Sequence, residues 1–519
     1  MGAGIAAVAA RAGFSVDLVE PDAAAAERAK QRLAREAARD AGAWAGTVVL
    51  HDAVPESSDA ILGLEAVVES AQVKAEVLGA LAKALPADAV LATNTSSLSV
   101  DELAQFVDRP ERFLGLHFFN PPTVMELVEI VPASGTSDAA LARARELIAR
   151  LGKTSVQASD TPGFIVNRVA RPYYLQSMHA LDEGVGAVEE LDALARGAGF
   201  RMGPFELMDL IGLDVSLATS ESIYERTGAA RLEPVALQRT MVADGRLGRK
   251  TGHGFYDYAD GSAPRVDDGL LAEPQTRNED ESVVIIGAGG LADDLAERLA
   301  EPFANVTRLE SEEFLNELSA AATIVIDVGD GTMDRSRVLR ELDGLLAPEC
   351  VIFADAYATD LDVTASALKH PERLVGYGIL GSLERQRVVE VVDLERVSDD
   401  ALALAQEVFE SLLRRVVLVE NAPGLFLGRT VASIVNEAVI AVHEDVASTD
   451  DIDVAMRLGT NYPIGPIAWG REIGGARIAR ILHRLADARG PAFAPHRALW
   501  VLDIDEDGED ALELDRPVL

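Results

Sequence analysis

The two residues of this sequence best suited to acid–base chemistry are His117 and Glu129, which stand twelve positions apart. A histidine titrates near neutral pH, and a carboxylate on one ring nitrogen fixes its tautomer and leaves the other nitrogen free to accept a proton. The run from Val124 to Val131 predicts a buried strand, so Glu129 is expected to be an acid inside a core, where it needs a partner. A lone histidine here would more often be a core residue bonded to the backbone, but the glutamate favours an enzyme site.

The elements around this pair predict a parallel sheet wrapped by helices. Strand-like runs such as Val67-Val68 and Ala89–Ala92 alternate with alanine-rich helical stretches. From Pro162 to about Tyr258 the pattern is helical throughout, which indicates a separate all-α domain. The polar stretch from Asp260 to Glu281 is typical of a linker.

The same plan then restarts, which indicates a tandem duplication. Val283–Ile286 followed by Gly287–Gly290 predicts a strand, a glycine turn and a helix start, the arrangement that lets backbone amides approach a pyrophosphate. Leu127–Val131 aligns with Val388–Val392, and Pro162–Phe164 with Pro423–Leu425, at one constant spacing. The predicted organisation is a dinucleotide-binding domain at 1–157, a helical substrate and dimerisation domain at 158–259, a linker at 260–281, a degenerate dinucleotide-binding domain at 282–418, a second helical domain at 419–502 and an acidic tail at 503–519.

Composition narrows the class of protein. With 519 residues and 48% hydrophobic content, the chain is expected to form at least three domains. A net charge of -38 opposes nonspecific binding to nucleic acid or to an anionic membrane. We expect a cytoplasmic protein, because no uncharged apolar run of about 18 residues and no basic leader occur. The single cysteine, Cys350, excludes an internal disulfide and a cysteine metal cluster and is expected to be a small core residue.

Four motifs of the first copy resemble NAD-dependent 3-hydroxyacyl-CoA dehydrogenases, specifically the bacterial 3-hydroxybutyryl-CoA dehydrogenase type. The resemblance covers Gly2 to Tyr258 and is carried by the segments Asn94–Leu98, Gly115–Pro121 with Glu129, Asp160–Arg168 and Gly248–Tyr256. It implies an α/β Rossmann-like domain followed by an all-α C-terminal domain, with the pair duplicated in tandem.

The resemblance also implies a role for each motif residue. His117 removes the proton of the 3-hydroxyl group while hydride leaves C3, and Glu129 holds the imidazole and stabilises its charged form. Ser96 and Asn167 hydrogen-bond the reacting oxygens and the nicotinamide end, while Asn120 is a weaker candidate that supports the geometry of the site. Donors fixed beside a forming alkoxide in a dry cleft need no solvent reorganisation.

The expected cofactor is NAD. Val16–Glu20 predicts a second strand that ends in an acid, and Glu20 would hold a ribose hydroxyl and repel a 2′-phosphate. Gly2 matches the last glycine of the family's fingerprint, and Asn94, Glu69 and Lys74 match positions at the nicotinamide side. For Glu69 and Lys74, a surface ion pair near one helix start is an equally good interpretation when the resemblance is set aside.

The acyl-CoA substrate needs cations for its phosphates. Four arginines recur at helical spacing on one face after the second predicted strand, where the family binds the adenosine end of CoA: Arg28, Arg32, Arg35 and Arg39. A solvated helix face is the alternative.

Two departures from the family pattern stand out. The sequence begins at Met1-Gly2, so the first strand and two fingerprint glycines are absent; we expect a start site further upstream, and weak NAD binding and poor stability if the chain begins here. The second copy replaces Ser96, His117, Asn120 and Asn167 by Tyr357, Gly378, Gly381 and Gly428, and of the compared site residues it keeps only Glu390 in place of Glu129. It also lacks the arginine-bearing excursion.

We therefore expect one active copy that oxidises an (S)-3-hydroxyacyl-CoA to the 3-oxoacyl-CoA with NAD, in β-oxidation of fatty acids or in aromatic-acid degradation. A short acyl group such as 3-hydroxybutyryl, or 3-hydroxyadipyl, is compatible with the sequence. The second copy would serve as a built-in partner in an intramolecular pseudo-dimer, with a homo-oligomer also open. The alternative from a different class is a catalytically impaired acyl-CoA-binding or scaffold protein, against which the intact set around His117 argues.

Overall fold

The computed structural model of the chain describes residues 1–40, 44–259, 281–310, 318, 322–329, 335–412 and 415–503. The predicted linker, apart from Glu281, and the predicted acidic tail beyond Asp503 lie outside these residues. The chain divides into two compact units. Unit 1 holds Met1–Val169, Glu225–Thr227 and Ala441–Asn461, and unit 2 holds Ala170–Tyr224, Gly228–Ile440 and Tyr462–Leu519.

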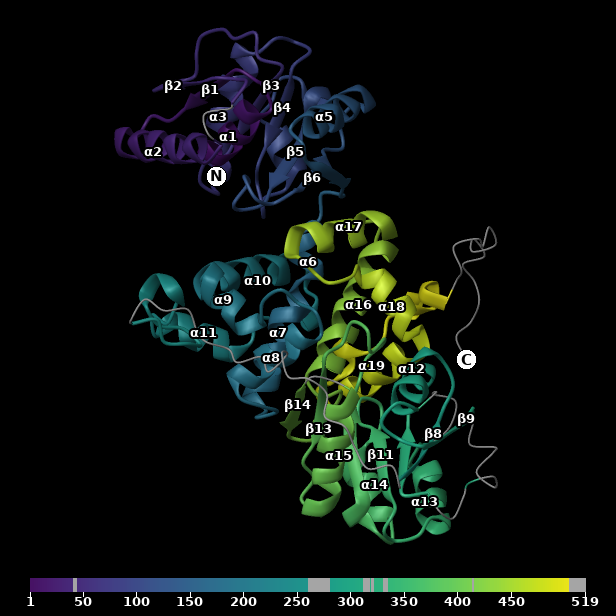
Figure 1. The fold of residues 1–519 in the computed structure, drawn as a ribbon. Coiled ribbons are helices and arrows are strands. Elements are labelled where there is room, and N and C mark those ends of the chain that lie inside the picture. Colours follow the sequence, from purple (N-terminus) through teal and green to yellow (C-terminus); the bar gives the residue numbers. More distant parts are fainter. Residues whose placement is uncertain are drawn as a thin grey trace. The chain divides into compact units, whose positions relative to one another are not determined.

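Unit 1 contains the first α/β domain (Figure 1). Its elements are α1 (Gly2–Arg11), β1 (Val16–Val19), α2 (Ala23–Arg39), β2 (Val48–His51), β3 (Leu62–Glu65), α3 (Ala71–Ala84), β4 (Val90–Thr93), α4 (Val100–Ala104), β5 (Phe113–Phe118), β6 (Leu127–Pro132), α5 (Asp138–Arg150) and β7 (Thr154–Gln157). The strands form a five-stranded sheet in the order β3-β4-β5-β6-β7 and a separate pair β1-β2.

The predicted limits of two strands in this domain were wrong. The strand expected at Val67-Val68 is β3, which ends at Glu65, because the Glu65 carboxylate accepts the N–H of Val67 (3.1 Å) in place of a ladder bond. Val68 is 69% exposed. The strand expected from Val124 begins only at Leu127, since the N–H of Val124 donates to the Pro121 carbonyl in a turn.

Unit 2 contains the second α/β domain. Its elements are β8 (Ser282–Ile286), α12 (Gly290–Leu299), β9 (Asn305–Leu309), β10 (Ile324–Asp327), α13 (Arg335–Leu345), β11 (Val351–Asp355), α14 (Leu361–Ala367), β12 (Leu374–Gly378), β13 (Val388–Val392), α15 (Asp399–Leu412) and β14 (Arg415–Val419). They form one seven-stranded sheet in the order β14-β13-β12-β11-β10-β8-β9. Cys350 is buried directly before β11, as expected.

The five-stranded sheet of the first copy, β3 to β7, matches the five strands β10 to β14 of the second in the same order. In each copy one pair of strands is antiparallel, β5 with β6 in the first and β12 with β13 in the second. The other pairs are parallel. β8 pairs with both β9 and β10. Among the described residues of the first copy, no strand holds the corresponding place between β1 and β3.

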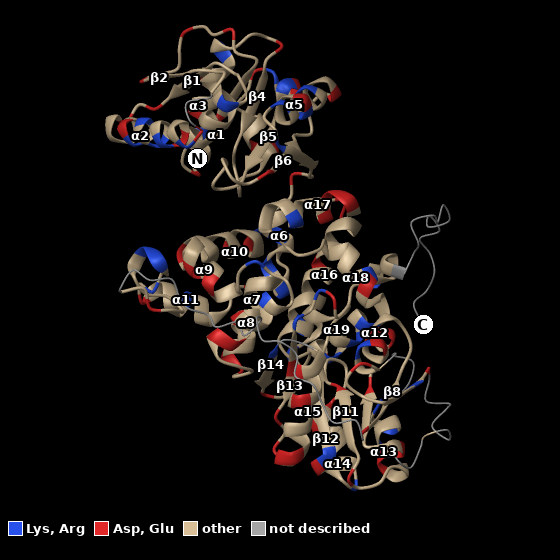
Figure 2. Cartoon of the chain, viewed as in Figure 1, with Lys and Arg blue, Asp and Glu red and all other residues tan. Residues whose placement is uncertain are grey.

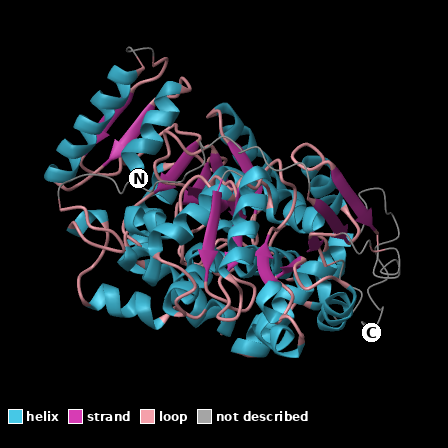
Figure 3. Ribbon diagram, turned by 60° about the horizontal axis from the view of Figure 1, so that its bottom comes forward, coloured by secondary structure: helices cyan, strands magenta, loops and turns pink. Residues whose placement is uncertain are grey.

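Helical segments follow each α/β domain, which confirms the predicted plan of an α/β domain and an all-α domain repeated in tandem. Helices flank the strands (Figure 3). The helices after the first domain are α6 (Val166–Val169), α7 (Arg171–Asp182), α8 (Val188–Gly197), α9 (Pro204–Ile211), α10 (Leu213–Thr227) and α11 (Ala236–Ala243), and those after the second are α16 (Leu427–His443), α17 (Thr449–Thr460), α18 (Pro466–Ile473) and α19 (Gly475–Arg489). Within the described residues, no helix has the length and apolarity needed to cross a membrane.

The motif Gly248–Tyr256 has a structural place in unit 2. The buried carboxylate of Asp209 in α9 accepts the N–H of Phe255 (3.0 Å), the N–H of Tyr256 (2.9 Å) and the hydroxyl of Tyr258 (3.0 Å). The Tyr256 hydroxyl donates in turn to Asp192 (2.7 Å), which also binds the first N–H groups of α9. These two aspartates therefore fasten the end of the first helical domain onto α9.

This arrangement predicts that Asp209→Ala lowers the free energy of unfolding of unit 2 by about 3 kcal/mol, because three buried donors lose their acceptor. Asp214→Ala is the matched control, since the Asp214 side chain is exposed, pairs with the exposed Lys250, and should cost under about 1 kcal/mol. Urea unfolding followed by circular dichroism measures both. Equal losses in the two variants would show that Asp209 is not a fastening point.

Candidate active site

The central pair of the site comes from two neighbouring strands. His117 in β5 and Glu129 in β6 lie directly opposite each other in the antiparallel register, and His117 Nδ1 is 2.6 Å from Glu129 Oε2. Glu129 is 0% exposed and His117 is 6% exposed. Because an ionised carboxylate can only accept, Nδ1 carries the proton and Nε2 keeps its lone pair.

The other carboxylate oxygen of Glu129 is held by the backbone. Glu129 Oε1 accepts the N–H groups of Ile165 (3.0 Å) and Val166 (2.9 Å). The turn just before them places Gly163 at φ 81° and Phe164 at φ 48°, a left-handed conformation that is strained for phenylalanine. The strained turn aims two successive N–H groups at one buried acid.

Asn167 follows these donors directly. It lies in the short helix α6, is half-buried, and is one residue beyond Val166. One carboxylate thus joins His117 to the N–H groups of Ile165 and Val166, and Asn167 is the next residue in the chain. Asn120 lies exposed just after β5.

The loop that carries Asn94 and Ser96 is tied to the histidine strand. Asn94 Oδ1 accepts the N–H of Phe118, the residue next to His117 (2.8 Å). Glu69 Oε1 accepts the N–H of Ser96 (2.9 Å) and the hydroxyl of Thr95 (2.6 Å). Burial alone would raise the pKa of Glu69, but the bond from Thr95 and the charge of Lys74 lower it to about 2.

Lys74 is buried, which rules out the alternative of a surface pair. Its side chain is 1% exposed, and its ammonium nitrogen lies 2.9 and 3.0 Å from the two oxygens of the buried Glu65 and 3.2 Å from Glu69. One ammonium charge balances only one of the two carboxylates, but its contacts with both of them hold both side chains in place. Lys74 thus holds Glu69 in place, and Glu69 holds the Ser96 loop.

The residues predicted for the cofactor's adenosine side lie at the start of a helix and at the end of a strand. Helix α1 begins at Gly2, and a Cβ on Gly2 would be 3.9 Å from Leu18 in β1 and from Ala66 just after β3. The first N–H groups of a helix lack intrahelical acceptors and favour an anion. Glu20 follows β1 directly. These donors and this carboxylate fit a pyrophosphate and a ribose hydroxyl.

The arginine stripe lies on α2 (Figure 2). Arg28 and Arg35 are exposed, and Arg39 is 3.4 Å from Glu36. Arg32 is half-buried against the first turn of α1, where its Nη2 would be 3.1 Å from a Cβ on Gly4. Arg32 is therefore the member of the stripe that packs against α1, while Arg28 and Arg35 face solvent.

The second copy keeps the glutamate and fills the rest of the site. Glu390 Oε1 accepts the N–H of Phe426 (2.8 Å), and the turn before it repeats the strained φ of 47° at Leu425. Where the first copy has His117, the Tyr357 hydroxyl donates to Glu390 (2.7 Å). Burial raises the pKa of Glu390 to about 7, although the bond from Tyr357 opposes the rise.

Three substitutions of the second copy are linked by one side chain. A Cβ on Gly378 would lie 2.5 Å from Tyr357 Cε1, and a Cβ on Gly428 would lie 2.5 Å from Tyr357 Cδ1. The tyrosine ring thus occupies the space that His117 and Asn167 use in the first copy. From the sequence these substitutions were interpreted as separate losses of site residues. The signal that they are linked is the presence of two glycines and one large aromatic residue at the matching positions.

A buried arginine closes the same region of the second copy. Arg477 in α19 is 3.2 Å from Asp355, the counterpart of Asn94, and donates to the carbonyl oxygens of Ile379 (2.7 Å) and Leu380 (3.0 Å). Its guanidinium lies 5.8 Å from the centre of the Tyr357 ring. The strand ends of this domain are therefore bonded to its own helical segment.

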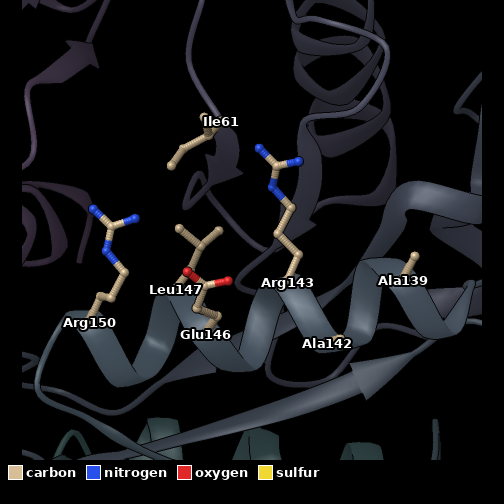
Figure 4. Close-up of a pocket in the computed structure, with 7 residues that line it drawn as sticks. All are labelled: Ile61, Ala139, Ala142, Arg143, Glu146, Leu147 and Arg150. Carbon is tan, nitrogen blue, oxygen red and sulfur yellow. The ribbon is translucent and has the colours of Figure 1, made fainter.

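A surface hollow lies apart from all of these residues. It is shallow, measures about 390 Å³, and lies over α5, lined by Ile61, Ala139, Ala142, Arg143, Glu146, Leu147 and Arg150 (Figure 4). Arg143 pairs with Asp88 (3.2 Å), and Arg150 stacks on Phe14. None of the predicted site residues lines it.

Comparison with known families gives two matches that each occur twice along the chain. The 3-hydroxyacyl-CoA dehydrogenase NAD binding domain matches residues 1–161 and 300–422. The 3-hydroxyacyl-CoA dehydrogenase C-terminal domain matches residues 163–258 and 424–508.

Relatives and solved structures agree with these matches. A 3-hydroxyadipyl-CoA dehydrogenase of Escherichia coli is 35% identical over 501 residues, which are 93% of this chain and 91% of that protein. A 3-hydroxybutyryl-CoA dehydrogenase of Bradyrhizobium diazoefficiens is 40% identical over 272 residues, 50% of this chain and 92% of that protein. The crystal structure of a 3-hydroxybutyryl-CoA dehydrogenase from Escherichia coli has a TM-score of 0.73 at 32% identity and covers 96% of this chain and 95% of that one.

The space filled by Tyr357 predicts a coupling between substitutions. Gly378→His should destabilise unit 2 by about 3 kcal/mol, because the new side chain collides with the tyrosine ring. In a Tyr357→Ser background the same change should cost at least about 1 kcal/mol less. Denaturant unfolding of the two single variants and the double variant measures this; strictly additive losses would contradict it.

Proposed function

The chain belongs to the 3-hydroxyacyl-CoA dehydrogenase family, and we propose that the residues around His117 form its one catalytic site. It is an NAD-dependent oxidoreductase that acts on a 3-hydroxyacyl-CoA. The observation that carries the proposal is the 2.6 Å bond between His117 Nδ1 and a fully buried Glu129. That bond leaves Nε2 as a base and supplies a countercharge for the imidazolium.

His117 removes the proton of the substrate's 3-hydroxyl group through Nε2. As the ring gains this proton, the Glu129 carboxylate stabilises the positive charge while the N–H groups of Ile165 and Val166 keep the carboxylate oriented. NAD, when bound, supplies the acceptor for the hydride that leaves C3. The product is the 3-oxoacyl-CoA.

Ser96 and Asn167 serve as donors to the reacting oxygen and to the nicotinamide end. Support comes from their anchoring: the Ser96 N–H is bonded to Glu69, and Asn167 follows the N–H donors that bind Glu129. Donors fixed before the reaction stabilise a developing alkoxide without having to reorganise. Lys74 acts through Glu69, and Asn94 joins this loop to β5.

The remaining ligand contacts are proposed from position and charge. Gly2 and Glu20 lie where the pyrophosphate and adenosine ribose of NAD are expected, and Arg32 and Arg28 on α2 face the phosphates of CoA. A short acyl group or a 3-hydroxyadipyl group is the proposed substrate class, since relatives named for each exist. A cytoplasmic location stays a prediction.

We assign no reaction to the second copy and propose that it is the internal partner in a pseudo-dimer. Support comes from contacts that occur twice with the copies exchanged. Arg168 of the first copy pairs with Glu444 of the second (2.7 Å), and their counterparts Arg429 and Glu183 pair in the reverse sense (2.5 Å). Reciprocal contacts of this kind are the mark of a two-fold interface.

Backbone hydrogen bonds and helix contacts also occur twice, with the roles of the two copies exchanged. The Ser159 N–H donates to the Val446 carbonyl (2.7 Å), and its counterpart, the Glu420 N–H, donates to the Val185 carbonyl (3.0 Å). Near the ends of α8 and α17, Gly197 approaches Val388 and Gly459 approaches Leu127, the counterpart of Val388.

The function predicts that the purified protein forms NADH from (S)-3-hydroxyacyl-CoA substrates, and that His117→Gln lowers kcat about 10²-fold or more, because the general base is lost. A panel from 3-hydroxybutyryl-CoA to 3-hydroxyadipyl-CoA, followed at 340 nm at saturating NAD, tests this and locates the preferred chain. Activity of His117→Gln within a few-fold of the unsubstituted protein would show that His117 is structural.

The two buried glutamates provide a matched pair of variants. Glu129→Gln should lower kcat about 10²-fold, because the imidazolium loses its countercharge. Glu390→Gln in the second copy has the same chemistry and burial and should leave kcat within about twofold. Comparable losses in both would contradict a single catalytic site in the first copy.

A further inference from the structure

The segment from Ser159 to Val169 carries much of the site and is held at its beginning by the second copy. It contains the strained turn at Phe164, the two N–H groups that bind Glu129, and the residue Asn167. The Ser159 N–H donates to the carbonyl of Val446 (2.7 Å), and the Ser159 hydroxyl donates to the carbonyl of Asp445 (2.6 Å).

The end of the segment is held by an ion pair with the same turn of the second copy. Arg168 is only 2% exposed, and its Nη2 lies 2.7 Å from Glu444 Oε2. Taking a guanidinium out of water is costly unless a countercharge is supplied. Glu444, whose side chain is 50% exposed, supplies that countercharge from outside the first copy.

Helix α17 packs against the segment near Val166. It packs on α6, β6 and β7. A Cβ on Gly459 would be 2.9 Å from Val166 Cγ2 and 2.9 Å from Leu127 Cδ2. Val166 provides one of the two N–H groups that bind Glu129, so the close approach of α17 bears directly on a donor of the site.

From these contacts we infer that Glu444, with the turn Glu444–Val446 and Gly459, positions the catalytic residues of the first copy. Glu444 acts through Arg168 on Asn167 and on the donors of Glu129, so the second copy completes a site to which it contributes no reacting group. This inference rests on the proposed function of the His117 site.

The duplication supplies a natural control. Glu183, the counterpart of Glu444, pairs with Arg429 and Arg489 beside Glu390 of the second copy. Each glutamate pairs with the matching arginine, Arg168 or Arg429, and Glu183 also pairs with Arg489, but only Glu444 borders a segment that carries a catalytic set. A general loss of stability would affect both alike, whereas a positioning role belongs to Glu444 alone.

The test compares Glu444→Gln with Glu183→Gln in the complete chain at saturating NAD. We expect Glu444→Gln to lower kcat about tenfold or more, because a displaced donor set slows hydride transfer. KM for the acyl-CoA should change less than about threefold, and the kinetic isotope effect with substrate deuterated at C3 should rise. Glu444→Asp should recover part of kcat, and Glu183→Gln should leave both quantities unchanged.

A second pair of variants covers the case in which Glu444→Gln does not fold. Gly459→Ala should lower kcat and raise the isotope effect, whereas Gly197→Ala, its counterpart against Val388, should not. An unchanged kcat in Glu444→Gln, or equal losses in the members of either pair, would overturn the inference. Absence of NADH formation by the unsubstituted protein would count instead against the proposed function.

Discussion

A carboxylate that is shielded from water must receive its hydrogen bonds from the protein, and Glu129 is in this position. Two backbone N–H groups and one imidazole satisfy it, and each partner imposes a demand on the chain. The imidazole requires β5 and β6 to be antiparallel in one register. The N–H groups require the strained turn at Phe164, which in turn places α6 and Asn167.

The second copy shows which contacts of the buried glutamate serve the fold and which serve catalysis. Glu390 keeps the two N–H donors and the strained turn, but a tyrosine hydroxyl replaces the imidazole. The glutamate persists in a copy without a base because removing it would leave buried donors unsatisfied. Its presence alone is therefore no sign of catalysis, and the histidine is the residue that distinguishes the two copies.

Much of the fold and the central pair could be predicted from the sequence, because alternating strands and helices repeat and because His117 and Glu129 stand on adjacent strands. A side-chain bond to the backbone ends β3 at Glu65, and a backbone turn after Pro121 delays the start of β6 until Leu127, and neither limit is marked by the hydrophobic pattern of the sequence. The burial of Lys74 was hidden because it depends on Glu65, which sequence reasoning did not single out. The pair of Arg168 with Glu444 joins residues from different copies, and no local pattern in the sequence marks it.

The filled site around Tyr357 also bears on how such a chain can evolve. In a homodimer every substitution appears in both subunits, so a residue that closes one cleft abolishes both activities. Fusion of the copies removes this coupling and lets one half drift toward stability while the other keeps an open and strained site. Tyr357, packed against Gly378 and Gly428, fills the site of the second copy only. Stability and catalysis usually place opposing demands on the same site. Here the two demands fall on different halves of one chain.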